Sequence, residues 1–258
     1  MLRTPLLALI TLLCLFPPLF YTEAEENFIL LDLASHTILQ EYGPAVNERM
    51  TPCSTFKIVL SVMGYDAGIL KNESNPTWDF QDGYDDWLAV WKTPQTPSSW
   101  MKYSCVWYSR VLAQHLGLAS FQHYLNKFDY GNQDASGGLT NAWINSSLTI
   151  SPLEQATFIQ KFLEGELPVS AHAIQMTKAI MYTETLPDGA KLFGKTGWSG
   201  STKDAQGQVY EIGWFVGWLE KEHLYYPFAY AIRDQKIDLN QRIPRVKELI
   251  NLSCKYNN

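Results

Sequence analysis

The sequence contains few of the residues from which metal sites and histidine-based catalytic sites are built. Its 258 residues include only five histidines and four cysteines, and no histidine lies in an H-x-H, an H-E-x-x-H or a cysteine-paired zinc spacing. A G-x-S-x-G nucleophile elbow and a glycine-rich phosphate loop are also absent. These absences predict no metal site, and they argue against a Ser-His-Asp triad and against a phosphate-binding loop.

Charged residues are also scarce, at 18% of the chain, and the net charge is −6. Nucleic-acid binding uses basic stripes or patches, so we predict no nucleic-acid partner. Hydrophobic residues make up 46% of the chain, which together with its length indicates a soluble globular protein with a sizeable core. The nine tryptophans supply either that core or a cleft for an apolar ligand.

An apolar run at the amino terminus is interrupted by two prolines. Residues 1–24 have a basic residue near the start, the apolar run over 6–20 and small residues at the end, which is the pattern of a secretory signal peptide. The run is too short for a stable membrane span. We therefore expect a cleaved signal peptide over residues 1–24, a secreted protein and a mature domain over residues 25–258.

Removal of the signal leaves three cysteines, Cys53, Cys105 and Cys254. An odd number, in a chain large enough to fold without covalent links, argues against a disulfide framework. We predict free thiols.

Apolar periodicity predicts strands at both ends of the chain and helices between them. The first helix is expected to begin at Ser54 and end near Gly64 or Gly68. The other predicted helices cover 106–116, 121–128 (with Ser120 as N-cap), 151–163, 171–181 and 244–252. A hairpin over 27–33 and 37–41 and strands over 191–198, 209–219 and 225–233 complete the pattern, while 72–100 is predicted to be an ordered loop. This order indicates an α+β fold, with one antiparallel sheet built from both chain ends, flanking helices and an inserted helical lobe.

The segment Pro52-Cys53-Ser54-Thr55-Phe56-Lys57 opens one of these helices. Residues three apart are neighbours on a helix, so Lys57 is expected beside Ser54, whose hydroxyl lies at the positive end of the helix dipole. Since no histidine is placed for the role, Lys57 is the candidate base, and burial lowers the pKa of a lysine toward that use. About one S-x-x-K is expected by chance in a chain this long, so the motif alone predicts little.

A second motif, Lys195-Thr196-Gly197, lies on a predicted strand. Lys195 offers a fixed positive charge for an anionic substrate, Thr196 offers a hydroxyl, and Gly197 permits close approach to the backbone. A main-chain N–H of Trp198 facing that of Ser54 would form an oxyanion hole. The alternative interpretation is an ordinary strand that ends in a turn.

Together, S-x-x-K and K-T-G in this order are the signature of penicillin-interacting serine enzymes. The sequence resembles the class D serine β-lactamases, the oxacillinases, over nearly the whole predicted mature chain. The matching segments are Ser54-Thr55-Phe56-Lys57, Ser104-Cys105-Val106, Tyr130-Gly131-Asn132, Asn141-Ala142-Trp143, Ser146-Ser147-Leu148, Ile150-Ser151-Pro152 and Lys195-Thr196-Gly197. The resemblance implies a serine β-lactamase or penicillin-binding-protein transpeptidase-like fold, hydrolysis of β-lactam antibiotics and a location in the bacterial periplasm.

The resemblance also implies a role for each matched residue. Ser54 would be the acylated nucleophile. Lys57, N-carboxylated by CO2 or bicarbonate, would be the general base for acylation and deacylation, with no other cofactor. Trp143 would hydrogen-bond the carbamate, and Ser104 would relay a proton to the leaving ring nitrogen. The remaining site residues would bind substrate: Val106, Lys195, Thr196, Gly197, Trp198 and a late arginine.

Arg242 stands at about the family's position for that arginine, and Arg233 and Arg245 remain alternatives. The S-D-N and E-x-x-x-N patterns of class A β-lactamases are absent. Other interpretations are a β-lactam-binding sensor domain that acylates without turnover, a D,D-peptidase and a non-catalytic structural protein. A small β-lactam substrate is the expected partner, and the sequence predicts no oligomeric state.

Overall fold

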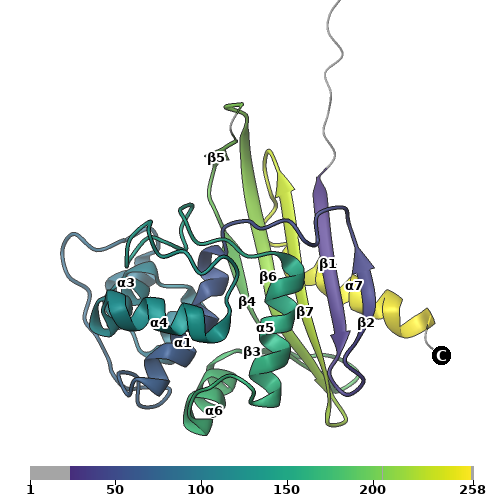
Figure 1. The fold of residues 1–258 in the computed structure, drawn as a ribbon, viewed down its shortest axis with the longest axis horizontal. Helices are drawn as coiled ribbons and strands as arrows, with labels where there is room; N and C mark the ends of the chain where they lie inside the picture. Colours follow the sequence, from purple (N-terminus) through teal and green to yellow (C-terminus); the bar gives the residue numbers. More distant parts are fainter. Residues whose placement is uncertain (1–23, 205, 257–258) are drawn as a thin grey trace, which may run out of the picture.

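A single antiparallel sheet organises the computed structural model, which describes residues 24–204 and 206–256, with side chains to Asn251. The predicted signal peptide, apart from Ala24, lies outside the described residues. The strand order is β2-β1-β7-β6-β4-β3, and β5 pairs with β6 beside this path. The first strand therefore lies inside the sheet, between the second and the last (Figure 1). This confirms the predicted sheet from both chain ends.

The strands follow the predicted pattern closely. Their bounds are β1 Glu25–Asp32, β2 Thr37–Tyr42, β3 Tyr182–Thr185, β4 Lys191–Trp198, β5 Thr202–Lys203, β6 Val209–Lys221 and β7 Leu224–Asp234. The amino-terminal hairpin and the three predicted late strands are confirmed, while the short strands β3 and β5 were not predicted.

Each face of the sheet is covered by helices, and alternate residues of β6 show why. Trp214, Val216 and Trp218 belong to the larger core, which includes residues of α5 and of the helical lobe. Phe215 and Leu219 face the other way and pack in a smaller core with α7. In Figure 1, α7 lies on one side of the sheet, α5 lies on the other, and the lobe with α1, α3 and α4 stands beside the sheet.

The helices are confirmed in place, with two differences. Their bounds are η1 Cys53–Phe56, α1 Lys57–Asp66, η2 Ala89–Lys92, α2 Pro97–Tyr103, α3 Val106–Leu116, α4 Leu118–Phe128, α5 Pro152–Glu164, α6 Ala171–Ile180 and α7 Arg242–Tyr256. The prediction of Ser120 as an N-cap was wrong, because α4 begins one residue after Gly117, whose φ of +74° makes the bend between α3 and α4. Helix α2, inside the predicted loop, begins with a capping box between Thr96 and Ser99.

Candidate active site

Ser54 lies in the tight 3₁₀ turn η1, immediately before helix α1. Lys57 is the first residue of α1, and its Nζ donates a hydrogen bond of 3.2 Å to Ser54 Oγ. The prediction that these two side chains lie beside each other is therefore confirmed. The preceding Cys53 has a φ of +52°, a conformation that is uncommon for a residue with a side chain and tightens the turn that presents Ser54.

Lys57 is buried, with 1% of its surface exposed. Burial disfavours the ammonium form and lowers the pKa of Lys57 from its ordinary 10.5 to about 8. At pH 7 the neutral amine is then roughly 300-fold more abundant than for a lysine in water, going by the difference between these two values. No Asp or Glu among the described residues forms an ion pair with Lys57.

Strand β4 packs against the turn that carries Ser54. A Cβ added at Gly197 would lie 3.1 Å from Pro52 O and 3.2 Å from Thr55 Cγ2, so glycine permits this close approach of strand and turn. Lys195 is buried on the same strand, and its Nζ donates to Thr196 O at 2.9 Å. Burial, together with the positive charges of Lys57 and Arg242, holds the pKa of Lys195 well below its ordinary value.

A cavity of about 330 Å³ opens at Ser54. It brings together most of the predicted site residues, since its lining includes Ser54, Ser104, Val106, Thr196, Gly197, Trp198 and Arg242. Five further residues of the lining add a mostly apolar surface that was not predicted: Trp87, Leu88, Trp91, Tyr103 and Leu239. Lys57, Trp143 and Lys195 are buried and do not belong to the lining.

The three candidate arginines differ in their hydrogen-bond and ion-pair partners. Arg233 forms an ion pair with Glu48, and Arg245 forms ion pairs with Glu26 and Glu248. Arg242 instead lines the cavity, and among the described residues its guanidinium donates to main-chain oxygens alone, at 2.8 Å to Leu239 O and 2.6 Å to Gly197 O. Arg242 is therefore the late arginine that remains available to an anionic ligand.

Trp143 is buried, and its ring stacks on Phe56 with a centroid distance of 5.2 Å. The Trp143 carbonyl accepts hydrogen bonds of 3.0 Å from the Cys53 N–H and from Thr51 Oγ1. The loop that carries Trp143 is thus joined directly to the turn that carries Ser54. Cys53 and Cys105 are buried free thiols, and the side chain of Cys254 lies outside the described residues.

Thr51 is a residue of this site that the sequence did not indicate. Its hydroxyl donates to Trp143 O and accepts from the Asn145 N–H at 3.0 Å, and its carbonyl accepts from Trp214 Nε1 at 2.9 Å. No short motif marks a threonine that joins three distant segments. Its position three residues before Ser54 is the one available signal.

We expect Thr51→Val to destabilise the fold by about 2 kcal/mol, or roughly 4–8 °C in Tm, because the buried Trp143 carbonyl and the part-buried Asn145 N–H each lose a hydrogen bond. Thermal unfolding of the purified protein measures this, and Thr51→Ser, which keeps the hydroxyl, is the control. Equal Tm values for Thr51→Val and the parent would show that the hydroxyl bonds contribute nothing.

The Tyr130-Gly131-Asn132 segment supports the site through hydrogen bonds to neighbouring segments. Tyr130 Oη donates to Gln155 Oε1 at 3.2 Å, and Gln155 Nε2 donates to Thr55 Oγ1 at 2.8 Å, one residue after Ser54. Asn132 donates to Ser147 O and accepts from the Thr149 N–H, which fixes the return of the Trp143 loop. Gln155 is a second supporting residue that no motif revealed.

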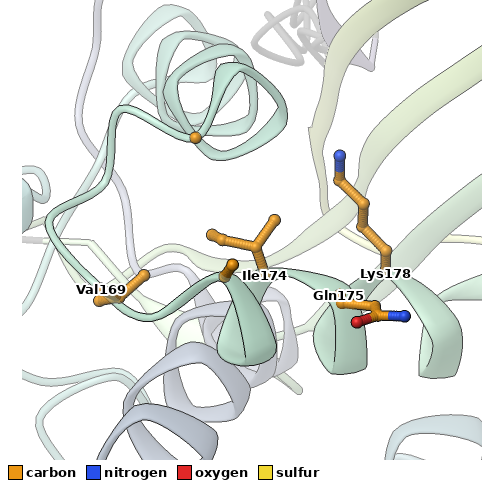
Figure 2. A pocket seen from close by; sticks show the side chains of 6 residues that line it. Val169, Ile174, Gln175 and Lys178 are labelled. Carbon is orange, nitrogen blue, oxygen red and sulfur yellow. The ribbon is translucent and has the colours of Figure 1, made fainter.

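A different pocket, of about 400 Å³, lies between the end of α5 and helix α6, away from Ser54 (Figure 2). It is lined by Gly165, Val169, Ala171, Ile174, Gln175 and Lys178. Lys178 Nζ donates to Leu163 O at 3.4 Å, so it satisfies a carbonyl at the end of α5. These lining residues include no Ser, Thr, Cys, His, Asp or Glu, whereas the cavity at Ser54 contains the predicted motifs, and the catalytic chemistry is assigned to that cavity.

Within the described residues, no cluster of three or more His, Cys, Asp or Glu side chains is arranged to hold a metal ion. No helix in the described part of the chain is long and apolar enough to cross a membrane.

A serine at the start of a buried helix, a lysine one turn along it and a K-T-G strand across the cavity define a penicillin-interacting serine enzyme. The family model for the penicillin-binding protein transpeptidase domain matches residues 25–251. The chain is 40% identical to β-lactamase OXA-9 of Klebsiella pneumoniae over 211 residues, which cover 78% of this chain and 76% of the relative. It is 39% identical to β-lactamase OXA-1 of Escherichia coli over 209 residues, which cover 78% of this chain and 73% of that relative.

Solved structures agree with these relatives. The crystal structure of the OXA-427 class D β-lactamase superposes with a TM-score of 0.82 at 37% identity, covering 90% of this chain and 99% of that one. The chain belongs to the class D β-lactamases.

Proposed function

We propose that this protein hydrolyses β-lactam antibiotics through an acyl-enzyme formed on Ser54. The observation that carries the proposal is the 3.2 Å contact between Ser54 Oγ and the buried Lys57 amine at the mouth of a cavity. Arg242 and Thr196 line the cavity and provide positive charge and a hydroxyl for the carboxylate that β-lactams carry, and a bound carboxylate would favour the charged form of the buried Lys195. The class D β-lactamases to which the chain is similar support this activity.

The surroundings of Lys57 fit an N-carboxylated lysine. Only a neutral amine adds CO2, and burial beside Phe56 and Val106 favours the neutral form. Lys57, Lys195 and Arg242 also lie close enough for their charges to interact, and none of the three has an ion-pair partner among the described residues. A carbamate on Lys57 would supply a basic oxygen beside Ser54 and would replace a buried positive charge with a negative one.

The steps then follow from the positions of the side chains. Ser54 Oγ loses its proton to the base on Lys57 and attacks the lactam carbonyl carbon, and the oxyanion is bound by the N–H groups of Ser54 and Trp198. The lactam C–N bond breaks, and Ser104 delivers a proton to the ring nitrogen. Water then loses a proton to the same base and hydrolyses the ester, which releases the opened product and restores the Ser54 hydroxyl. Trp143 is assigned to hold the carbamate through its indole N–H.

The test is to incubate the mature protein with a penicillin, with and without bicarbonate, and to follow ring opening together with the mass of the protein. We expect sustained turnover that increases with bicarbonate. A stable adduct on Ser54 without turnover would instead assign the chain to a sensor-type role, and the absence of both adduct and ring opening would contradict the proposal.

The pH dependence of reactivation follows from the lowered pKa of Lys57. Since the neutral amine reacts with CO2, the reactivation rate of bicarbonate-depleted protein should rise about fivefold from pH 7 to pH 8 and less than about twofold above pH 8, for a pKa near 8. Stopped-flow assays at fixed dissolved CO2 measure this rate. A rate that keeps rising tenfold per pH unit to pH 10 would show that Lys57 retains an ordinary pKa.

We also propose that residues 1–24 direct export to the bacterial periplasm, where β-lactams meet their targets. The composition of this segment supports the proposal. Amino-terminal sequencing of the exported protein would identify the cleavage site, and an intact amino terminus in the exported protein would contradict it.

A further inference from the structure

One wall of the cavity is an indole whose outer half is open to solvent. Trp198 lines the cavity, and 44% of its surface is exposed. A side chain at the end of a strand, with this much exposure, has several rotamers available unless a partner holds it. Trp198 has such a partner, because its Nε1 donates a hydrogen bond of 3.1 Å to Glu211 Oε2.

Glu211 is a buried carboxylate, with 8% of its surface exposed, and it has no ion-pair partner among the described residues. Its Oε2 also accepts from the main-chain N–H of Ile237 at 3.1 Å, and its Oε1 accepts from Ser201 Oγ at 3.4 Å. A buried carboxylate is costly to maintain unless its oxygens are hydrogen-bonded, so these donors fix Glu211 in place. Glu211 in turn fixes the indole of Trp198.

The contacts of Glu211 continue to other residues that line the cavity. Ile237 begins the short connection to Leu239, which lines the cavity, and Leu239 O accepts from Arg242 Nε. Arg242 Nη1 then donates to Gly197 O, the residue next to Trp198. Glu211 therefore lies in a closed ring of contacts that joins four residues of the lining, Gly197, Trp198, Leu239 and Arg242.

We infer that Glu211 is a positioning residue which holds the Trp198 indole as a binding wall for a flat, apolar group on the substrate. The inference rests on the proposed β-lactam hydrolysis. Glu211 itself does not line the cavity, so its effect on the substrate passes through Trp198. Loss of Glu211 should therefore weaken the binding of substrates that carry such a group and leave the chemical step at Ser54 unchanged.

Comparison of two substrates distinguishes weaker binding at the Trp198 indole from a general loss of activity. One is a penicillin with a phenylacetyl side chain, and the other is 6-aminopenicillanic acid, which has the same rings and no acyl group. For Glu211→Leu we expect the KM of the first substrate to rise five- to tenfold with kcat within twofold, and the KM of the second to stay within twofold of the parent. Glu211→Gln keeps an oxygen for Trp198 and Ile237, so it should behave as the parent does.

A double-mutant comparison tests the route of the effect. Trp198→Phe keeps a ring but removes the N–H donor, so it should raise the KM of the phenylacetyl penicillin, and adding Glu211→Leu to it should raise that KM by less than twofold more. Equal changes for both substrates, or fully multiplicative effects of the two substitutions, would overturn the inference. If the parent protein neither opened the lactam ring of either compound nor was acylated by it, both the proposed function and the inference would be overturned.

Discussion

Replacement of Lys57 by alanine is expected to reduce penicillin turnover about a thousandfold and to leave an acyl group on Ser54. A positioned general base contributes roughly 10²- to 10⁴-fold to a rate, and here one base is assigned to both acylation and deacylation. Slow acylation followed by slower hydrolysis leaves the ester in place, so the mass of the protein should increase by that of the penicillin. Intact mass spectrometry during a steady-state assay measures both effects.

Two variants control this experiment. Ser54→Ala should give neither turnover nor adduct, which identifies the site of attachment. Lys71→Ala removes an exposed lysine that does not line the cavity and should behave as the parent does. Turnover by Lys57→Ala at the parent rate would show that the base lies elsewhere.

The second large effect is expected on stability, from Gly217→Ala. Gly217 pairs with Gly194 across β6 and β4, and an added Cβ would lie against Phe193 O and 2.6 Å from Gly194 Cα. These are backbone atoms, so the two strands must separate. We expect a loss of about 3 kcal/mol, equivalent to roughly 6–12 °C in Tm, together with lower activity because β4 carries Lys195 to Gly197.

Gly83→Ala is the matched control for this glycine. Nothing lies within 4 Å of a Cβ built at Gly83, although its φ of +93° adds some backbone strain, on the order of 1 kcal/mol. Thermal unfolding of both variants gives the comparison. A Tm for Gly217→Ala as high as that of Gly83→Ala would mean that the sheet accommodates the methyl group without opening.

The sequence predicted those parts of the fold that depend on local pattern. Alternation placed β4 and β6, and the capping box Ser151-Pro152-Leu153-Glu154 placed the start of α5, where both of its reciprocal hydrogen bonds form. Helix α2 was missed although Thr96 and Pro97 carry the same kind of signal, because tryptophans and prolines around it suggested a loop. The short edge strand β3 was also missed.

The site was predictable where its residues lie in motifs, and much less so where they support those motifs. Ser54 and Lys57 are close because helix geometry requires it. Arg242 could be chosen over Arg233 only once the hydrogen-bond partners of each arginine were known, and these partners lie up to 185 positions away in the chain. Thr51, Gln155 and Glu211 have no local signature, since their hydrogen bonds reach segments that only the folded chain brings together.

The place of β1 inside the sheet has a consequence for how the chain acquires its structure. Glu25 pairs with Arg233 and Leu30 with Phe228, so β1 gains this neighbour in the sheet only after β7 has been synthesised. Pairings between such distant residues make folding slow, because a long loop must be ordered before they form. A nascent chain that ends before β7 leaves β1 with an unpaired edge, which is a site for aggregation. The sheet can therefore be completed only after β7 has left the ribosome.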